Sequence, residues 1–549
     1  MKQRLIGGIM RATILLFISA GLSIAQPAAD SASHCVVISE GAPALPAQLL
    51  EGQGKIDFPI TTANPEARKF FEQGVAQMHS FWAREAERSF LQAAKLDPAA
   101  PMPWWGVAMV AAGDFRPHFQ LVRDKHLPGT LPATPNAKRS LAAARRAREL
   151  AAVPGQATET EKLFIDAIWA RRNPDSPDPD AAYTAGIRRV IAANPKDPEA
   201  RTYLALHLMD GFNTPAREPR PGSMEAVELL RQLTREFPGH PGAHHFVIHG
   251  WEGSNFAKDA WESCKQYAAL VPNIPHALHM PGHIYAQTGK LKEAQAAFTA
   301  AAVLERKFMA ADKEYGNGHH GHNIHFLSVA LAADGQFDAA FAAAKELLGL
   351  AETDKEKKTP DAHRTAFRQG SFAMVRSLVW AEKWDEILTG SLLPELTTPR
   401  EKFWRHWARG LAFSAKKDVT AATAELAAMR AVQLDFEKQV KASPPREFGV
   451  AMQELQGFID LAQGKSKRAW KVLESASKAE RALRYNEPPI YPRPVAEAWG
   501  QAALRSGNRK LAEKVFRIAL HEMPESRIPL EGLRQLTTRR QDGQVSGGN

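Results

Sequence analysis

The chain has 549 residues, of which 44% are hydrophobic and 24% are charged. This balance excludes a disordered protein, and the length is too great for a single compact core. The formal net charge is +10, but basic and acidic residues are interspersed and no basic cluster has aromatic neighbours, so no nucleic-acid partner is expected.

The first 25 residues have the parts of a secretory signal peptide. Lys2, Arg4 and Arg11 form a basic region, Ala12–Ile24 is a short apolar run, and small residues suit cleavage near the Ala25–Gln26 bond. An uncleaved membrane anchor is the alternative. No other apolar run is long enough to span a membrane, so no membrane span is expected after cleavage. We therefore expect a periplasmic or secreted protein.

Residues 26–64 are expected to form an extended segment ahead of the first helical pattern. The chain has two cysteines, Cys35 and Cys264. An exported protein permits a disulfide, but no spacing argues for this one. Cys264 falls at a large-residue packing position between helices, so a buried thiol is expected.

From residue 65 onward the sequence repeats itself at fixed offsets. The offsets 0, 12, 16, 19 and 24 are occupied by Gly74, Ala86, Phe90, Ala93 and Pro98, and again by Gly500, Ala512, Phe516, Ala519 and Pro524. Partial copies begin at Gly282, at Gly410 (with Leu426 at offset 16) and at Gly457 (with Leu473). Small residues let two antiparallel helices approach closely, the large residue fills the gap, and the proline ends the second helix.

This pattern resembles the tetratricopeptide repeat, a helix–turn–helix unit of 34 residues, over residues 65–538. The resemblance implies an all-α fold whose repeats stack into a right-handed superhelical solenoid, in an exported bacterial member of that superfamily. We expect residues 65–350 to hold the histidine-rich central repeats, 351–538 to hold C-terminal repeats, and 539–549 to be disordered. Because most members are binding scaffolds, the resemblance also implies a protein or peptide partner in the concave groove.

The central repeats keep the same register. Ala226, Ala260 and Ala294 are 34 residues apart, which puts three successive second helices in phase. Two long insertions, at 210–223 and 306–320, interrupt this region, and loops of such length often mark function.

Seven histidines fall on three repeat positions in three consecutive units, which start at Pro241, Pro275 and Gly321. Position 2 holds His276 and His322, position 5 holds His245, His279 and His325, and position 9 holds His249 and His283. On an α-helix these positions lie within about 60° of one another, so they form one stripe on each first helix. By the resemblance, first helices line the concave face.

Two imidazoles spaced i and i+4 can share one metal ion, and the stripe contains two such pairs. Neutral imidazole suits Cu, Zn and Fe, and a cluster without cysteine or several carboxylates favours Cu or Zn. We therefore predict a transition-metal site with seven candidate ligands: His245, His249, His276, His279, His283, His322 and His325. Glu252, at position 12, is the candidate ligand, orienting group or catalytic base.

Three functions remain open at this stage. The first is an exported repeat scaffold whose groove binds a transition metal. The second is a metalloenzyme, a hydrolase or oxidoreductase in which Glu252 is the general base acting on metal-activated water. The third is a metal-free interaction scaffold whose histidines hydrogen-bond a peptide. A histidine network that only holds the repeats together is the structural alternative.

Several neighbouring residues carry weaker expectations. Pro281 should kink its helix, unless the helix begins only there and leaves His276 in a loop. The register points His244, His319 and His320 away from the stripe, so solvated side chains are expected for all three. His79 is expected to be structural and far along the superhelix. The stretch from Tyr485 to Tyr491 is interpreted as a linker in preference to a cap over the groove.

Overall fold

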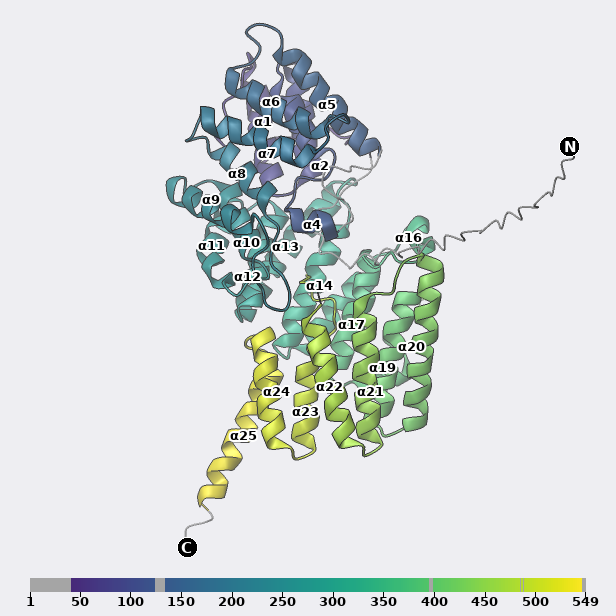
Figure 1. Cartoon of the computed structure of the whole chain (residues 1–549). Coiled ribbons are helices and arrows are strands. Elements are labelled where there is room, and N and C mark those ends of the chain that lie inside the picture. Colours follow the sequence, from purple (N-terminus) through teal and green to yellow (C-terminus); the bar gives the residue numbers. More distant parts are fainter. Residues whose placement is uncertain (1–40, 124–133, 394–397, 484, 487, 546–549) are drawn as a thin grey trace, which may run out of the picture.

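The computed structural model describes residues 41–123, 134–393, 398–483, 485–486 and 488–545 (Figure 1). Within them the chain forms α-helices and one 3-10 helix, and the only β-type pairing there is an isolated bridge between Phe212 and Pro219. The all-α prediction is therefore confirmed. Among the described helices, none is both long and apolar enough to cross a membrane. The expected signal peptide lies outside the described residues and stays a prediction. Cys35 also lies outside them.

The first half of the chain, at the top of Figure 1, consists of successive helical hairpins. Many first helices begin with proline directly after a side chain that caps the free N–H groups, as Asn64 does before Pro65 and Asp197 before Pro198. The elements are α1 (Pro65–His79), α2 (Ala83–Leu96), α3 (Met102–Val110), α4 (His118–Arg123), α5 (Pro135–Ala151), α6 (Glu159–Arg172), α7 (Pro179–Ala193), α8 (Pro198–Leu208), α9 (Ser223–Glu236), α10 (Pro241–Trp251), η1 (Ala257–Ala260), α11 (Trp261–Leu270), α12 (Pro275–Gln287) and α13 (Leu291–Ala311).

The second half continues the series of hairpins below the first (Figure 1). Its elements are α14 (Gly318–Ala333), α15 (Phe337–Leu348), α16 (Asp354–Lys358), α17 (Ala366–Trp380), α18 (Trp384–Thr389), α19 (Pro399–Ala415), α20 (Val419–Val440), α21 (Arg446–Ala462), α22 (Ser466–Arg481), α23 (Val495–Arg505), α24 (Arg509–Glu522) and α25 (Arg527–Val545). Residues 539–545, expected to be disordered, continue helix α25, whose Leu536 is buried one turn earlier. Residues 546–549 lie outside the described part.

The predicted pairing of glycine with a large residue sixteen positions later holds the hairpins together. A Cβ atom at Gly74 would lie 2.6 Å from the Phe90 ring, and one at Gly500 would lie 2.6 Å from Phe516. Gly457 faces Leu473 in the same way, and Gly282 faces Phe298. Gly410 is the exception: it faces Leu455 of α21 instead of the expected Leu426, because α19 also packs against α21.

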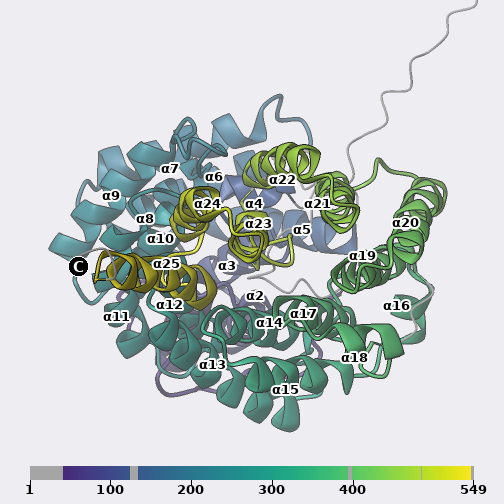
Figure 2. The same ribbon diagram turned by 90° about the horizontal axis from the view of Figure 1, so that it is seen from below.

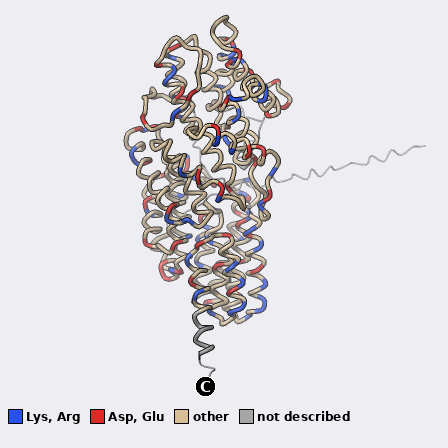
Figure 3. The backbone as a smooth tube through the Cα atoms, turned by 90° about the vertical axis from the view of Figure 1, so that its left-hand side faces the viewer, with Lys and Arg blue, Asp and Glu red and all other residues tan. Residues whose placement is uncertain are grey.

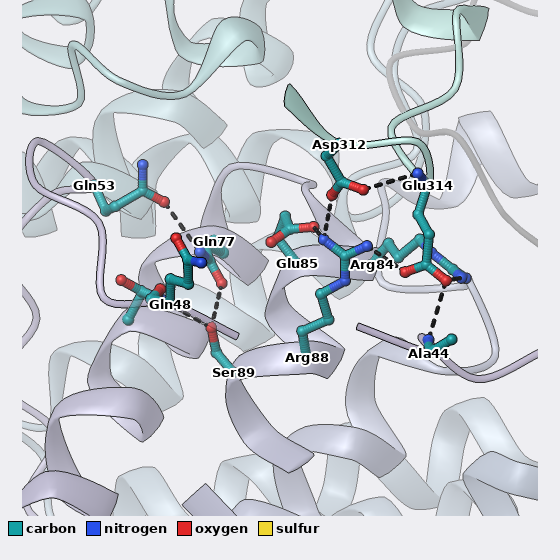
Figure 4. A network of polar contacts seen from close by, with 11 residues as sticks. Ala44, Gln48, Gln53, Gln77, Arg84, Glu85, Arg88, Ser89, Asp312 and Glu314 are labelled. Carbon is teal, nitrogen blue, oxygen red and sulfur yellow. Dashed lines mark hydrogen bonds and ion pairs between the residues drawn. The ribbon is translucent and has the colours of Figure 1, made fainter. Parts of the chain in front are cut away.

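The N-terminal end of the repeat array folds back onto the central helices. Arg88 of α2 pairs with Glu85, with Asp312 at 2.5 Å and with Glu314 in the loop after α13. Glu314 also accepts a hydrogen bond from the backbone N–H of Ala44 (Figure 4). The first hairpin, the extended N-terminal segment and the 312–317 loop are thus tied together across more than 200 residues of sequence.

The C-terminal end returns to the same central region. In Figure 2 the helices of the second half follow a curve. Gly289, after α12, faces Pro524 and Glu525, and Gly335, after α14, faces Arg527 at the start of α25. The Trp380 indole N–H of α17 donates to Glu497 of α23 at 2.5 Å, and Arg217, in the loop before α9, pairs with Glu522 of α24 at 3.4 Å. Basic and acidic residues are interspersed along the chain (Figure 3), as the sequence indicated.

The glycine–phenylalanine contact predicts a stability difference between two substitutions of the same type. Gly74→Ala should destabilise the protein by about 1–3 kcal/mol, because the added methyl group overlaps the buried Phe90 ring. Gly449→Ala, at a helical glycine with no atom within 4 Å of the added Cβ, should be neutral or stabilising by up to about 1 kcal/mol. Urea unfolding followed by circular dichroism measures both, and equal midpoints for the two variants would contradict this packing.

Candidate metal centre

Helices α10, α12 and α14 carry the predicted stripe. Helices α10 and α12 begin at Pro241 and Pro275, as the register required. Helix α12 runs through Pro281, so the alternative in which this helix starts at Pro281 is wrong, and His276 lies in its first turn.

Helix α14 begins at Gly318, three residues before the expected start. His319 and His320 therefore lie in its first turn and are buried, and the expectation that they are solvated is wrong. The preceding helix α13 is 21 residues long and absorbs the first part of the predicted insertion, leaving only a short loop before α14.

The structure sorts six of the seven candidate ligands into two groups. In each group one nitrogen atom per histidine lies within 4.8 Å of the others. Triad 1 consists of His245 and His249 of α10 and His276 of α12; triad 2 consists of His279 and His283 of α12 and His322 of α14. Each triad combines the histidines at positions 5 and 9 of one repeat with the histidine at position 2 of the next repeat.

His325 belongs to neither triad. Position 9 of its own repeat holds Val329, so the i, i+4 partner that completes the other groups is missing. Its ring instead packs 5.8 Å from that of Phe372. Burial and the nearby Arg376 guanidinium lower the pKa of His325 well below its usual value.

The triads are buried instead of facing an open groove. All six imidazoles are at most 4% exposed. Phe81, in the turn between α1 and α2, stacks on His249 with ring centroids 5.2 Å apart, and Phe326 stacks on His283 at 4.4 Å. The prediction of a stripe on an open concave face is wrong in this respect, because the two ends of the repeat array close over it.

One carboxylate connects the two triads. Glu252, the residue that follows α10, accepts hydrogen bonds from Nδ1 of His249 at 2.8 Å and from Nδ1 of His283 at 2.7 Å. These contacts hold the pKa of Glu252 well below its usual value, against the opposing effect of burial. A carboxylate in this state only accepts hydrogen bonds, so both Nδ1 atoms carry a proton, and in the neutral form of each ring Nε2 presents a lone pair.

A second carboxylate, Glu305 of α13, fixes one further ring in each triad. It accepts from Nδ1 of His319, whose Nε2 lies 3.1 Å from Nδ1 of His276 in triad 1. It also accepts from the side-chain amide of Asn323 at 3.1 Å, and the amide oxygen accepts from Nδ1 of His279 in triad 2 at 2.7 Å. Both relays again place the proton on Nδ1 of the ligand histidine.

The ring of His245 is held in place by a backbone group. Nδ1 of His245 donates to the carbonyl oxygen of His79 at 2.5 Å. With Nδ1 occupied, Nε2 of His245 faces Nε2 of His276 at 3.1 Å, while Nε2 of His279 faces Nε2 of His283 at 2.7 Å. Nε2 of His249 is buried and has no hydrogen-bond partner among the described residues.

Facing lone pairs would be stabilised by a cation between them. Two neutral imidazoles whose Nδ1 atoms both donate repel one another through their Nε2 atoms, and no hydrogen bond can join them. A tetrahedral metal ion with Zn–N or Cu–N bonds of about 2.0–2.1 Å holds its nitrogen ligands roughly 3.3 Å apart, near the 3.1 Å between His245 and His276, whereas the 2.7 Å between His279 and His283 would have to lengthen. The donor set, imidazole nitrogen without thiolate, fits Cu or Zn.

The pKa shifts favour the neutral form of three of the six ligand histidines. Burial lowers the pKa of His245, His276 and His279 well below its usual value, and the neighbouring imidazoles lower it further. His320 behaves differently: hydrogen bonds to Glu305 and Glu346 raise its pKa to about 9, so it stays protonated at neutral pH. This cation offsets part of the negative charge behind the triads.

A third group, His79, Glu199 and His240, lies beside triad 1 and also has one ligand atom per residue within 4.8 Å of the others. Glu199 of α8 accepts from Nε2 of His79 at 2.7 Å and from Nε2 of His240 at 3.1 Å. His79 is structural, as expected, but it does not lie far along the superhelix, because α1 packs against α10 and places its carbonyl on His245. The sequence had no signal for this contact, which joins the first repeat to the fifth hairpin.

Two other expectations concern residues next to the site. His244 is buried, with hydrogen bonds to Ser263 and to the carbonyl of Pro238, so the expectation that it is solvated is wrong. Cys264 is a buried free thiol whose pKa is raised by burial, which confirms its assignment as a packing residue.

Cavities adjoin both triads. A cavity of about 60 Å³ reaches His276 of triad 1. Triad 2 has a cavity of about 80 Å³ at His322 and one of about 210 Å³ at His283. Asn486, Pro489 and Ile490 line both of the cavities at triad 2, so the segment interpreted as a linker in fact caps this region.

The helical hairpins confirm the predicted tetratricopeptide-type fold. The sequence matches no protein-family model and no curated protein. Similar solved structures include the Cut9–Hcn1 hetero-tetramer of the APC/C (TM-score 0.31, 12% identity, 86% of this chain and 76% of that chain). They also include the human IFIT1 dimer with m7Gppp-AAAA (0.32, 13%, 88% and 91%) and the P58(IPK) TPR domain (0.23, 12%, 87% and 99%). At these values the similarity carries no argument about this chain.

The lowered histidine pKa values predict acid-sensitive stability of the metal-free protein. The unfolded state binds protons below the usual histidine pKa of about 6.5, whereas His245, His276 and His279 stay neutral when folded, so the free energy of unfolding should fall as pH falls. Each histidine contributes at most about 1.4 kcal/mol per pH unit below 6.5. Urea unfolding of chelator-treated protein at pH 7.5 and 5.5 measures the loss.

The triple variant H245Q/H276Q/H279Q should flatten this dependence, and H521Q, at an exposed histidine, should leave it unchanged. A wild-type protein that is equally stable at pH 7.5 and pH 5.5 would contradict the neutral, buried state of these rings.

Proposed function

We propose that this protein is an exported helical-repeat protein that binds transition-metal ions, Cu or Zn in preference to Fe, in two adjacent histidine triads. The observation that carries the proposal is the direction of the rings: in five of the six ligand histidines Nδ1 is tied to a protein group and Nε2 points into the triad. Such outer hydrogen bonds are the usual partners of metal-bound histidine, since they fix the tautomer and raise ligand basicity.

Glu252 orients the ligands and does not serve as the base. Both of its oxygens accept from imidazole N–H groups, and its lowered pKa makes it a weak proton acceptor. Because it touches one histidine of each triad, a metal ion in one triad would polarise a carboxylate that also contacts a ligand of the other.

A metalloenzyme is the second candidate, and the cavities at triad 2 favour it. Three histidine ligands leave a fourth position on a tetrahedral metal for water or substrate. His283 and His322 both line cavities where such a molecule has room. The metal-free peptide scaffold has less support, because the ligand histidines are buried away from any peptide-sized surface.

Metal analysis of the exported, untagged protein tests the proposal. We expect close to two Cu or Zn ions per chain by mass spectrometry. His249→Ala should remove about one ion through triad 1, His283→Ala should remove about one through triad 2, and the double variant should retain almost none. All variants should keep the helical circular dichroism spectrum.

Two matched controls are available among the other buried histidines. His244→Ala and His325→Ala should both retain two ions, since neither ring belongs to a triad. Absence of metal from the wild type even after incubation with Cu or Zn would refute the metal site. A loss in His325→Ala equal to that in His283→Ala would refute the division into triads.

Glu252→Gln should weaken metal binding at both triads, by about 10–100-fold in affinity, because loss of this outer carboxylate frees His249 and His283 to turn. Competition with a chromophoric chelator measures the two affinities. Glu262→Gln, at an exposed glutamate in the same repeat, serves as the control and should change neither. An effect of Glu252→Gln confined to one triad would show that the carboxylate does not connect them.

A further inference from the structure

The largest of the cavities at triad 2 has a distinct chemical character. Its volume is about 210 Å³, and His283 forms part of its wall. Apolar side chains from α12 and α14 line one side, among them Phe326 and Val329, and Ile490 closes it from the C-terminal segment. An apolar pocket with a few polar groups is the usual form of a small-molecule site.

Arg376 of α17 is the notable polar group in this wall. Its side chain is 1% exposed, and no carboxylate among the described residues pairs with it. One guanidinium nitrogen donates to the carbonyl of Pro489 at 2.5 Å, the group lies 5.1 Å from the Phe372 ring, and Nε is buried without a partner in the described part of the chain. A buried cation lacking a counterion is costly, so a site of this kind gains from an anionic ligand.

Two of the other three arginines at this cavity pair with carboxylates, and the third, the half-buried Arg481, donates from Nε to the carbonyl of Ser477 at 3.4 Å. Arg217 pairs with Glu522 at 3.4 Å, and Arg493 pairs with Glu454 at 3.1 Å. Glu480 accepts from the backbone N–H of Val495 at 2.8 Å, burial raises its pKa to about 8, and no ion pair joins it to Arg376. Among the described lining residues, the cavity thus keeps an excess of positive charge, at the fully buried Arg376 and the half-buried Arg481.

We propose that this cavity binds a small organic carboxylate, with its carboxylate group on Arg376, its apolar body against Phe326, Val329 and Ile490, and its far end toward His283. Guanidinium and carboxylate match in geometry and form charge-assisted hydrogen bonds. The cavity, the buried guanidinium and the apolar wall carry the ligand class on their own. The placement of the far end at a metal ion rests on the proposed function, and it names the substrate class of triad 2.

Benzoate is a suitable probe, with benzamide as its uncharged counterpart. In isothermal titrations of the full-length protein at pH 7, benzoate should bind at least about tenfold more tightly than benzamide. Arg376→Gln should weaken benzoate binding at least tenfold and leave benzamide binding unchanged. Arg217→Gln, at the paired arginine of the same cavity, should change benzoate binding less than threefold.

Equal binding of benzoate and benzamide by the wild type would overturn the proposal, and this comparison requires no variant to fold. Undiminished benzoate binding by a folded Arg376→Gln variant would overturn it as well.

Parallel titrations of metal-loaded and chelator-treated protein separate this proposal from the metal site. Benzoate binding that depends on Arg376 in both preparations supports the carboxylate site even if no metal is retained. A protein that holds metal but does not distinguish benzoate from benzamide keeps the metal site and loses the carboxylate site. With Cu(II) bound, saturation by benzoate should shift the visible absorption band, and an unchanged band would refute the placement of the ligand beside triad 2.

Discussion

The carboxylate of Glu252, buried and shared between two imidazoles, is the interaction on which the centre depends. A buried carboxylate must be compensated by hydrogen-bond donors, and here the donors are Nδ1 of His249 and Nδ1 of His283. Once Nδ1 of a ring donates a hydrogen bond, the orientation of the ring is fixed, and with it the direction in which Nε2 points. Glu305 does the same for one more ring of each triad through His319 and Asn323. Two carboxylates thus determine how lone pairs from three consecutive repeats converge.

The closure of the repeat array explains why the histidines of the two triads are buried from solvent. An open solenoid would leave position-2, -5 and -9 side chains in contact with water, where histidine would titrate near its usual pKa. Here the first hairpin places Phe81 on triad 1, and the segment around Pro489 covers triad 2. The ion pairs of Arg88 and the hydrogen bond from Trp380 to Glu497 hold the two ends in place. Metal binding and closure should therefore stabilise one another.

The two triads differ in their surroundings, so we propose different roles for them. Triad 1 adjoins the smallest of the three cavities and lies under an aromatic ring, conditions suited to firm retention of an ion. Triad 2 adjoins two cavities, one of which contains a buried guanidinium without a counterion. If both triads bind metal as proposed, exchange of ligands would be expected at triad 2, and the shared carboxylate of Glu252 would connect the two ions.

The sequence by itself determined what depends on local spacing. Helix periodicity and the glycine–phenylalanine offsets fixed the hairpins, and the 34-residue register placed the histidines on matching faces of α10, α12 and α14. Only the tertiary structure decided which rings meet, because that depends on the rotation of each helix against its neighbour and on how far the array curls. The contact of His79 with His245, the burial of His319 beside Glu305 and the exclusion of His325 all arise from such non-local packing. Arg376 is the clearest case: nothing in its sequence neighbourhood marks it, and the cavity it lines exists only because residues more than a hundred positions away fold back over α17.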